Sequence, residues 1–109
     1  MTEALTHLDP PELHQWLTTG REVVLVDVRT PAEVARGAIP GAHPIPLHEL
    51  TRARALDKDQ PVVFYCQSGG RSQQACIVLQ RQGHKKVYNL RGGILAWQRH
   101  GLPVAAVTS

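Results

Sequence analysis

Cysteines, aromatic residues and long apolar runs are all scarce in this sequence of 109 residues. Two cysteines are too few for a disulfide framework, so we expect reduced thiols, one of which is free for chemistry. The longest apolar stretches, around residues 23–28 and 62–66, fall far short of the roughly 18 residues that a membrane helix needs. The first residues have neither the basic start nor the apolar segment of a signal peptide. We therefore expect a cytoplasmic protein that does not span a membrane.

An excess of one charge is also missing, since 12 Lys and Arg face 9 Asp and Glu, a formal net charge of +3. The basic residues are spread along the chain, so we expect no nucleic-acid partner and at most a preference for small anions. The composition, 42% hydrophobic and 19% charged, is typical of a soluble globular domain. Six histidines lack the close Cys/His spacing of a zinc site, so we interpret them as solvated surface residues and expect no metal. They are His7, His14, His43, His48, His84 and His100.

Short apolar segments alternate with helix-like segments along the whole chain. Strands are predicted at residues 5–8, 23–28, 43–45, 62–65 and 87–90. Helices are predicted to begin after the caps Asp9 and Thr30, to cover 47–56, to run from Ser72 to Gly83, and to lie around Trp97. The runs 23–28 and 62–65 are almost entirely apolar, which is typical of central strands covered on both faces. The pattern predicts one α/β domain over residues 1–109, with a mostly parallel central sheet and helices on both faces.

Cys66 follows the predicted strand 62–65 and stands before the loop 67–71. Ligands of parallel sheets bind at this carboxyl edge. Glycines in the loop allow successive backbone N–H groups to converge on the sulfur, and Arg71 would close the ring with a cation. A thiol with the ordinary pKa of about 8.5 is only about 3% thiolate at pH 7, so such a ring would turn it into a nucleophile. The alternative interpretation is an ordinary turn between a strand and a helix.

The loop Cys66-Gln67-Ser68-Gly69-Gly70-Arg71-Ser72 has the form Cys-x-x-Gly-x-Arg-Ser, and the sequence thereby resembles the rhodanese-like family. Further segments stand in the family's order: Asp27-Val28-Arg29 with Glu33, Ile39-Pro40-Gly41-Ala42, and Leu90-x-Gly92-Gly93-x-x-x-Trp97-x-x-x-Gly101-x-Pro103. One departure is Ala38, where many relatives carry a histidine. The resemblance covers nearly the whole chain.

The resemblance implies a three-layer domain with thiosulfate sulfurtransferase (rhodanese) activity and no cofactor. Cys66 would attack the outer sulfur of a small anionic donor and carry that sulfur as a persulfide to cyanide or a thiol acceptor. A sulfur-relay protein is a further possible partner. Asp27 and Arg29 would support the site without reacting. The substrate would be bound by the loop residues Gln67, Ser68, Gly69, Gly70, Arg71 and Ser72.

Two other functions compete with this interpretation. Thiol phosphatases and arsenate reductases also combine a cysteine, converging amides and an arginine, but they place five residues between cysteine and arginine where this chain has four. A noncatalytic persulfide carrier would use Cys66 only to hold sulfur for a protein partner. Cys76 is interpreted as a core residue, with a resolving thiol as the alternative. Gly92 and Gly93 predict a sharp turn or a close backbone approach near the loop.

Overall fold

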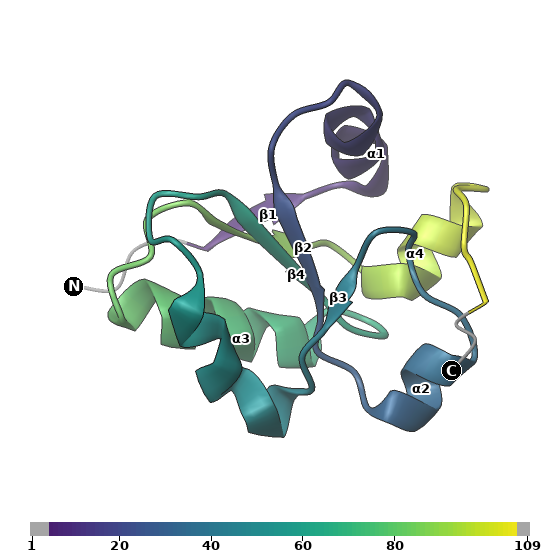
Figure 1. The fold of residues 1–109 in the computed structure, drawn as a ribbon. Helices are drawn as coiled ribbons and strands as arrows, with labels where there is room; N and C mark the ends of the chain where they lie inside the picture. Colours follow the sequence, from purple (N-terminus) through teal and green to yellow (C-terminus); the bar gives the residue numbers. More distant parts are fainter. Residues whose placement is uncertain (1–4, 107–109) are drawn as a thin grey trace.

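A single sheet of parallel strands, in the order β1-β5-β4-β2-β3, organises the protein (Figure 1). The computed structural model describes residues 5–106, apart from the side chains of residues 54 and 55. The elements in chain order are β1 (Thr6–Leu8), α1 (Pro10–Thr18), β2 (Val24–Asp27), α2 (Pro31–Ala35), β3 (His43–Pro44), η1 (Leu47–Ala55), β4 (Val62–Tyr65), α3 (Gly70–Arg81), β5 (Val87–Leu90) and α4 (Gly93–Arg99). The predicted alternation of strands and helices is confirmed.

The two faces of the sheet are covered by different helices, as Figure 1 shows. Because successive side chains of a strand point to opposite faces, Val26 and Leu25 of β2 enter different cores. Val26 packs in a core that includes residues of α3 and η1. Leu25 packs in a core that includes residues of α1 and α4. The sheet with helices on both faces, predicted from the uninterrupted apolar runs, is therefore confirmed.

The helix predicted over 47–56 is a 3-10 helix over Leu47–Ala55, with a kink at Glu49. Three apolar residues of the helix, Leu47, Leu50 and Ala53, stand three positions apart, and Leu56 after its end continues the spacing. A 3-10 helix has three residues per turn, so this spacing lines all four up against the core beside α3. Among residues 5–106, no helix has the length and apolar character needed to cross a membrane.

Helix α3 begins at Gly70, two residues before the predicted start at Ser72. Gly69 precedes the helix with a φ of +113°, a backbone conformation that residues other than glycine rarely adopt. This turn brings Gly70 and Arg71 into the first helical turn, where backbone N–H groups have no partner inside the helix. The first turn of α3 also contains Ser72, whose backbone N–H is one of the donors to Cys66, the residue that follows β4.

His84, predicted to lie on the surface, follows α3 in the segment before β5 and is buried, only 3% exposed. Neither of its ring nitrogens has a hydrogen-bond partner among the described residues. Burial, with a further contribution from the nearby Lys58 charge, lowers the pKa of His84. The surface prediction was wrong because a histidine's polarity says little about where a neutral imidazole lies.

We expect the burial of His84 to make stability depend on pH. The folded protein binds a proton at His84 less readily than the unfolded chain, whose pKa is near 6.5. The free energy of unfolding is therefore highest above that pH, falls below it by at most about 1.4 kcal/mol per pH unit, and levels off below the lowered pKa. Urea titrations across this range test it. His84→Leu should flatten the dependence and the exposed-site control His43→Gln should not; equal slopes in all three proteins would contradict the account.

Candidate active site

Three neighbouring strands end at one edge of the sheet and deliver the candidate residues there. Strand β4 leads into Cys66, the adjacent β2 leads to Arg29, and β5, on the other side of β4, leads to Gly92. Parallel strands share one carboxyl edge, so Cys66 lies between these two neighbouring chain segments. The sheet thereby fixes the nucleophile candidate at the centre of the edge.

The loop after Cys66 turns its amides toward the sulfur. The N–H of Gly69 donates to Cys66 Sγ at 3.0 Å. The backbone carbonyls at the start of the loop are bound by α4. The carbonyl of Cys66 accepts from the N–H of Ile94 at 3.0 Å, and the carbonyl of Gln67 accepts from the N–H of Leu95 at 3.2 Å. Because the start of α4 holds these carbonyls, the loop's N–H groups face the thiol.

Gly93 makes this contact between the loop and α4 possible. A Cβ at Gly93 would lie 2.4 Å from the Gln67 carbonyl oxygen and 2.5 Å from that of Cys66. Its φ of +63° is a second reason for glycine at this position. The predicted close backbone approach near the loop is therefore confirmed at Gly93.

The environment of Cys66 favours its thiolate although the residue is only 1% exposed. Burial alone would raise the pKa of the thiol. Hydrogen bonds from the Ser72 hydroxyl, 3.5 Å from Sγ, and from the backbone N–H groups of Ser72, Gly69 and Ser68 outweigh burial and lower that pKa. Donors that lower the pKa of a thiol increase the fraction present as thiolate, which is the form of cysteine that acts as a nucleophile.

Arg71 lies at the rim of this loop and binds a partner that the sequence did not suggest. Its guanidinium donates to both carboxylate oxygens of Glu33, at 2.7 and 2.8 Å. The hydrogen bond with Arg71 is the main reason that the pKa of Glu33 is lowered to about 2. Two of the five guanidinium donors are used in this fork, which leaves three for a ligand. Glu33 therefore orients the arginine and partly neutralises its charge.

Asp27 and Arg29 form a brace beneath the site. Both are buried, 1% and 3% exposed, and their closest approach is 2.7 Å between Arg29 Nη2 and Asp27 Oδ2. Arg29 Nη2 also donates to the carbonyl of Gly37 at 2.7 Å. The Tyr65 hydroxyl accepts from the N–H of Ile39 at 3.1 Å. These contacts tie the ends of β2 and β4 to the turn before β3.

Cys76 is a residue of α3 that packs in the core, and it is fully buried. Its thiol donates to the carbonyl of Tyr88 at 3.4 Å, and burial raises its pKa to about 12. Both cysteines are free thiols. The geometry therefore agrees with the interpretation of Cys76 as a core residue.

Comparison with known proteins identifies the family. The sequence model described as the rhodanese-like domain matches residues 9–100. This chain belongs to the rhodanese-like domain family. The family and fold predicted from the motifs around Cys66 are thereby confirmed.

Rhodanese-like relatives match over nearly the whole chain. A protein named sulfurtransferase from Allochromatium vinosum is 50% identical over 103 residues, which cover 94% of this chain and 96% of that protein. A protein named thiosulfate sulfurtransferase GlpE from Stutzerimonas stutzeri is 36% identical over 97 residues, 88% of this chain and 86% of that protein. The solution structure of a rhodanese-like domain from Anabaena sp. has a TM-score of 0.86 at 26% identity, covering 95% of this chain and 81% of that one.

A small polar cavity adjoins the loop of this rhodanese-like domain. Its volume is about 160 Å³, and it is lined by Gln67, Glu33, Arg29, Arg36 and residues of α4. Pockets for drug-sized ligands measure about 300–1,000 Å³, so this one suits a small ion better. Gln67, which lines this cavity, and Ser68 are exposed, whereas Gly69 and Ser72 are buried like Cys66. The predicted binding residues thus differ in exposure: Gly69 and Ser72 are buried, Arg71 is half-buried, and Gln67, Ser68 and Gly70 are exposed.

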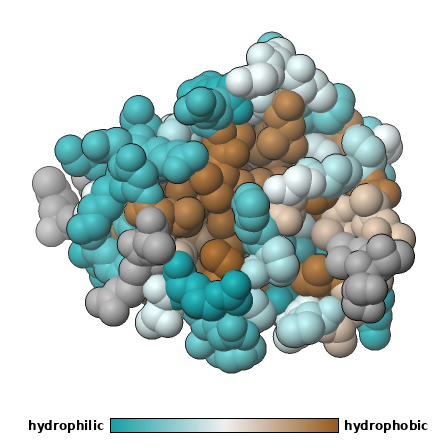
Figure 2. Space-filling model, in the orientation of Figure 1, coloured by the Kyte–Doolittle hydropathy of each residue, from teal (hydrophilic) through white to brown (hydrophobic). Residues whose placement is uncertain are grey.

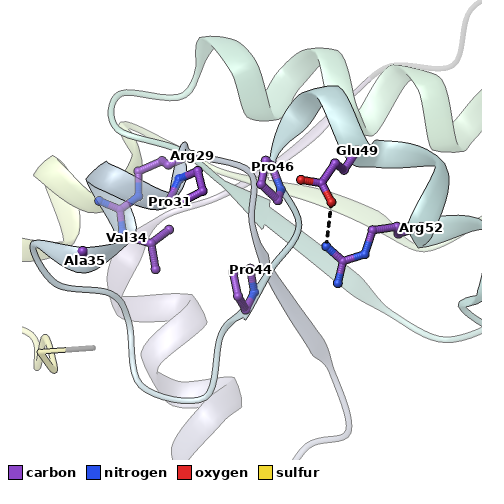
Figure 3. A pocket seen from close by; sticks show the side chains of 8 residues that line it. All are labelled: Arg29, Pro31, Val34, Ala35, Pro44, Pro46, Glu49 and Arg52. Atoms are coloured by element: carbon purple, nitrogen blue, oxygen red, sulfur yellow. Dashed lines mark hydrogen bonds and ion pairs between the residues drawn. The ribbon is translucent and has the colours of Figure 1, made fainter. Parts of the chain in front are cut away.

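Two larger cavities lie away from the loop, beside the edge strand β3. One, of about 350 Å³, is lined mainly by Val24, Val26, Ile45 and Leu56, on the face whose centre is apolar in Figure 2. The other, of about 430 Å³, lies between α2 and η1, where Figure 3 shows Arg52 paired with Glu49. Among the described residues, neither lining includes any from Cys66 to Ser72.

Three residues near the site escaped the sequence analysis as functional candidates: Glu33, Asn89 and His7. Asn89 is a polar residue inside an apolar strand, and that position was the available signal for it. Its side chain contacts Ser72 and His7. Within the part of the chain that the structure describes, no cluster of three His, Cys, Asp or Glu is placed to hold a metal ion.

Proposed function

We propose that this chain is a thiosulfate sulfurtransferase that carries a sulfane sulfur as a persulfide on Cys66. The observation that supports it most is the set of N–H groups and the Ser72 hydroxyl directed at the Cys66 sulfur, which lower the pKa of its thiol. The names of the two relatives described above point to sulfur transfer as well. The proposal treats residues 1–109 as one working domain.

The reaction has two displacement steps at sulfur. In the first, the Cys66 thiolate attacks the outer sulfur of thiosulfate, a new S–S bond forms, and sulfite leaves with the electron pair of the broken bond. In the second, cyanide or a thiolate attacks the outer sulfur of the persulfide and expels the Cys66 thiolate. The loop N–H groups stabilise the negative charge before and after each step. The proposed steps involve no cofactor.

The dimensions of the site favour a small donor. Cys66 is 1% exposed, so an inorganic ion reaches its sulfur more readily than a bulky molecule. The adjoining cavity of about 160 Å³ provides room for such an ion. Arg71 keeps guanidinium donors for the sulfonate oxygens of thiosulfate. A protein that donates or accepts sulfur would have to reach the persulfide through the exposed side of the loop, near Gln67.

Mass spectrometry of the intact protein tests the proposal. After exposure to thiosulfate we expect a mass gain of one sulfur atom on Cys66, and after addition of cyanide we expect its loss with release of thiocyanate. A phosphatase or arsenate reductase would take up no sulfur. A noncatalytic carrier would gain sulfur and fail to turn over with cyanide or small thiols. Either result would overturn the proposed activity.

We expect Arg71→Ala to raise the KM for thiosulfate roughly 10- to 100-fold, because it removes charge-assisted hydrogen bonds to the donor. The pKa of Cys66 should rise too, since the variant removes a nearby cation and leaves the Glu33 carboxylate unpaired. Steady-state kinetics and thiol titration measure both effects. Arg81→Ala, at the far end of α3, is the matched control. An unchanged KM in Arg71→Ala would exclude a role in donor binding.

A further inference from the structure

A chain of side-chain contacts runs from Cys66 across two strands to His7. The Ser72 hydroxyl lies 3.5 Å from Cys66 Sγ and is hydrogen-bonded to the Asn89 side-chain amide. That amide lies 3.1 Å from Nδ1 of His7, its direct neighbour across the β1–β5 pairing. Ser72 and Asn89 are buried, 0% and 1% exposed. The sulfur is thus connected through buried polar groups to an imidazole on the edge strand.

The Ser72 hydroxyl has more acceptors than protons. Three acceptors surround it: Cys66 Sγ, the Gly69 carbonyl at 3.1 Å, and Asn89 Oδ1. A hydroxyl donates one proton at a time. While Asn89 Oδ1 faces the hydroxyl, that oxygen competes with the sulfur for the proton. If the amide turns over, Asn89 Nδ2 donates to the hydroxyl oxygen, and the Ser72 proton is released to the sulfur.

The imidazole of His7 can satisfy either orientation of the Asn89 amide. With Nδ2 of the amide facing it, His7 Nδ1 accepts a hydrogen bond and carries no proton. With Oδ1 facing it, His7 Nδ1 must carry the proton and donate. A neutral His7 changes between the two forms by exchanging its proton between Nδ1 and Nε2 through solvent. The only proton lost from the protein as Cys66 ionises is then the thiol proton.

We propose that Asn89 and His7 are positioning residues that direct the Ser72 hydroxyl to Cys66 when its sulfur becomes an anion. With the thiol, Ser72 donates to Asn89 Oδ1. With the thiolate, the amide is reversed, Ser72 donates to Sγ, and His7 Nδ1–H donates to Asn89 Oδ1. The effect on catalysis rests on the proposed function. The relay stabilises the Cys66 thiolate, which the acceptor expels in the second displacement step, and it therefore speeds that step.

Nuclear magnetic resonance of the His7 ring nitrogens tests the relay without any substrate. As the pH passes through the Cys66 titration, we expect the His7 tautomer to change from Nε2–H toward Nδ1–H. In Cys66→Ala, which has no thiol to ionise, the change at that pH should be absent. A His7 ring that keeps the same tautomer in both proteins would overturn the proposal. Sulfur uptake measured by mass spectrometry is independent, so a failed sulfurtransferase and a failed relay give different results.

A set of His7 variants provides a second test. Glutamate at this position only accepts, so His7→Glu holds Asn89 Nδ2 toward itself and leaves Oδ1 competing for the Ser72 proton. We expect the pKa of Cys66 to rise by about one unit. Glutamine both donates and accepts, so His7→Gln should keep the wild-type pKa.

The same His7→Glu change in a Ser72→Ala background separates the relay from simple charge repulsion. Repulsion between the new carboxylate and the sulfur survives the loss of the hydroxyl, whereas the effect of the relay does not. We therefore expect a much smaller rise in the Cys66 pKa in this background. An equal rise with and without the Ser72 hydroxyl would refute the relay.

Discussion

We expect Cys66→Ser to lose sulfur transfer by at least about 10⁴-fold and to keep the native fold. A serine oxygen does not form a persulfide under these conditions, so the first displacement step has no nucleophile. The exchange of sulfur for oxygen hardly alters the volume of a side chain that is already surrounded by donors, the Gly69 N–H and the Ser72 hydroxyl. Turnover with thiosulfate and cyanide, together with circular dichroism, measures both parts of the expectation.

Cys76→Ser is the matched control for this experiment. Cys76 is a buried residue of α3, and the pKa of its thiol is raised to about 12, so it is not a nucleophile near neutral pH. A serine hydroxyl at this position still donates to the Tyr88 carbonyl. The control should therefore transfer sulfur at the wild-type rate. Substantial turnover in Cys66→Ser, or a loss of turnover in Cys76→Ser, would show that Cys66 is not the nucleophile.

Of the substitutions considered, Gly93→Ala should destabilise the protein most, lowering the free energy of unfolding by about 2–5 kcal/mol. The new Cβ would lie 2.4 to 2.6 Å from backbone atoms of Cys66 and Gln67, which cannot move without displacing the loop. The α4 N–H groups that hold the two carbonyls would be displaced with it. We also expect the pKa of Cys66 to rise, because the loop's N–H groups lose their alignment. Urea denaturation and thiol titration measure the two effects.

Gly101→Ala separates collision from backbone strain. Gly101 has a φ of +71°, close to that of Gly93, but a Cβ there would meet nothing within 4 Å. We expect it to cost only the strain of the left-handed conformation, about 1–2 kcal/mol, and to leave the Cys66 titration unchanged. If both variants lose the same stability and neither alters the thiol, then the contact between α4 and the loop does not hold the site together.

Local patterns predicted the strands that carry the site. The apolar runs that became β4 and β5 have the bounds expected from the sequence, because a strand covered on both faces has little freedom in register. The glycine at position 93 indicated a close approach for a similarly local reason. The three-residue spacing of Leu47, Leu50 and Ala53 also indicated the 3-10 geometry of η1. The prediction of a helix there did not take this spacing into account.

The long-range side-chain pairings were not predicted. Glu33 has a complete local explanation as the partner of Thr30 in a capping box, which hid its second role as the partner of Arg71. His84 was interpreted from its polarity, although the residue is buried. Asn89 and His7 meet only because β1 and β5 are paired in the sheet. Contacts of this kind depend on how distant segments pack, which no local pattern records.

Titration of the Cys66 thiol, followed by the ultraviolet absorbance of the thiolate, shows directly whether the loop stabilises the Cys66 anion. Cys76, with its pKa raised to about 12, does not interfere in the neutral range. We predict a single transition, absent in Cys66→Ser, at a pKa below the ordinary cysteine value, because the loop's N–H groups and the Ser72 hydroxyl stabilise the anion. A pKa at or above the ordinary value would show that burial outweighs these donors and that Cys66 is not held as a nucleophile.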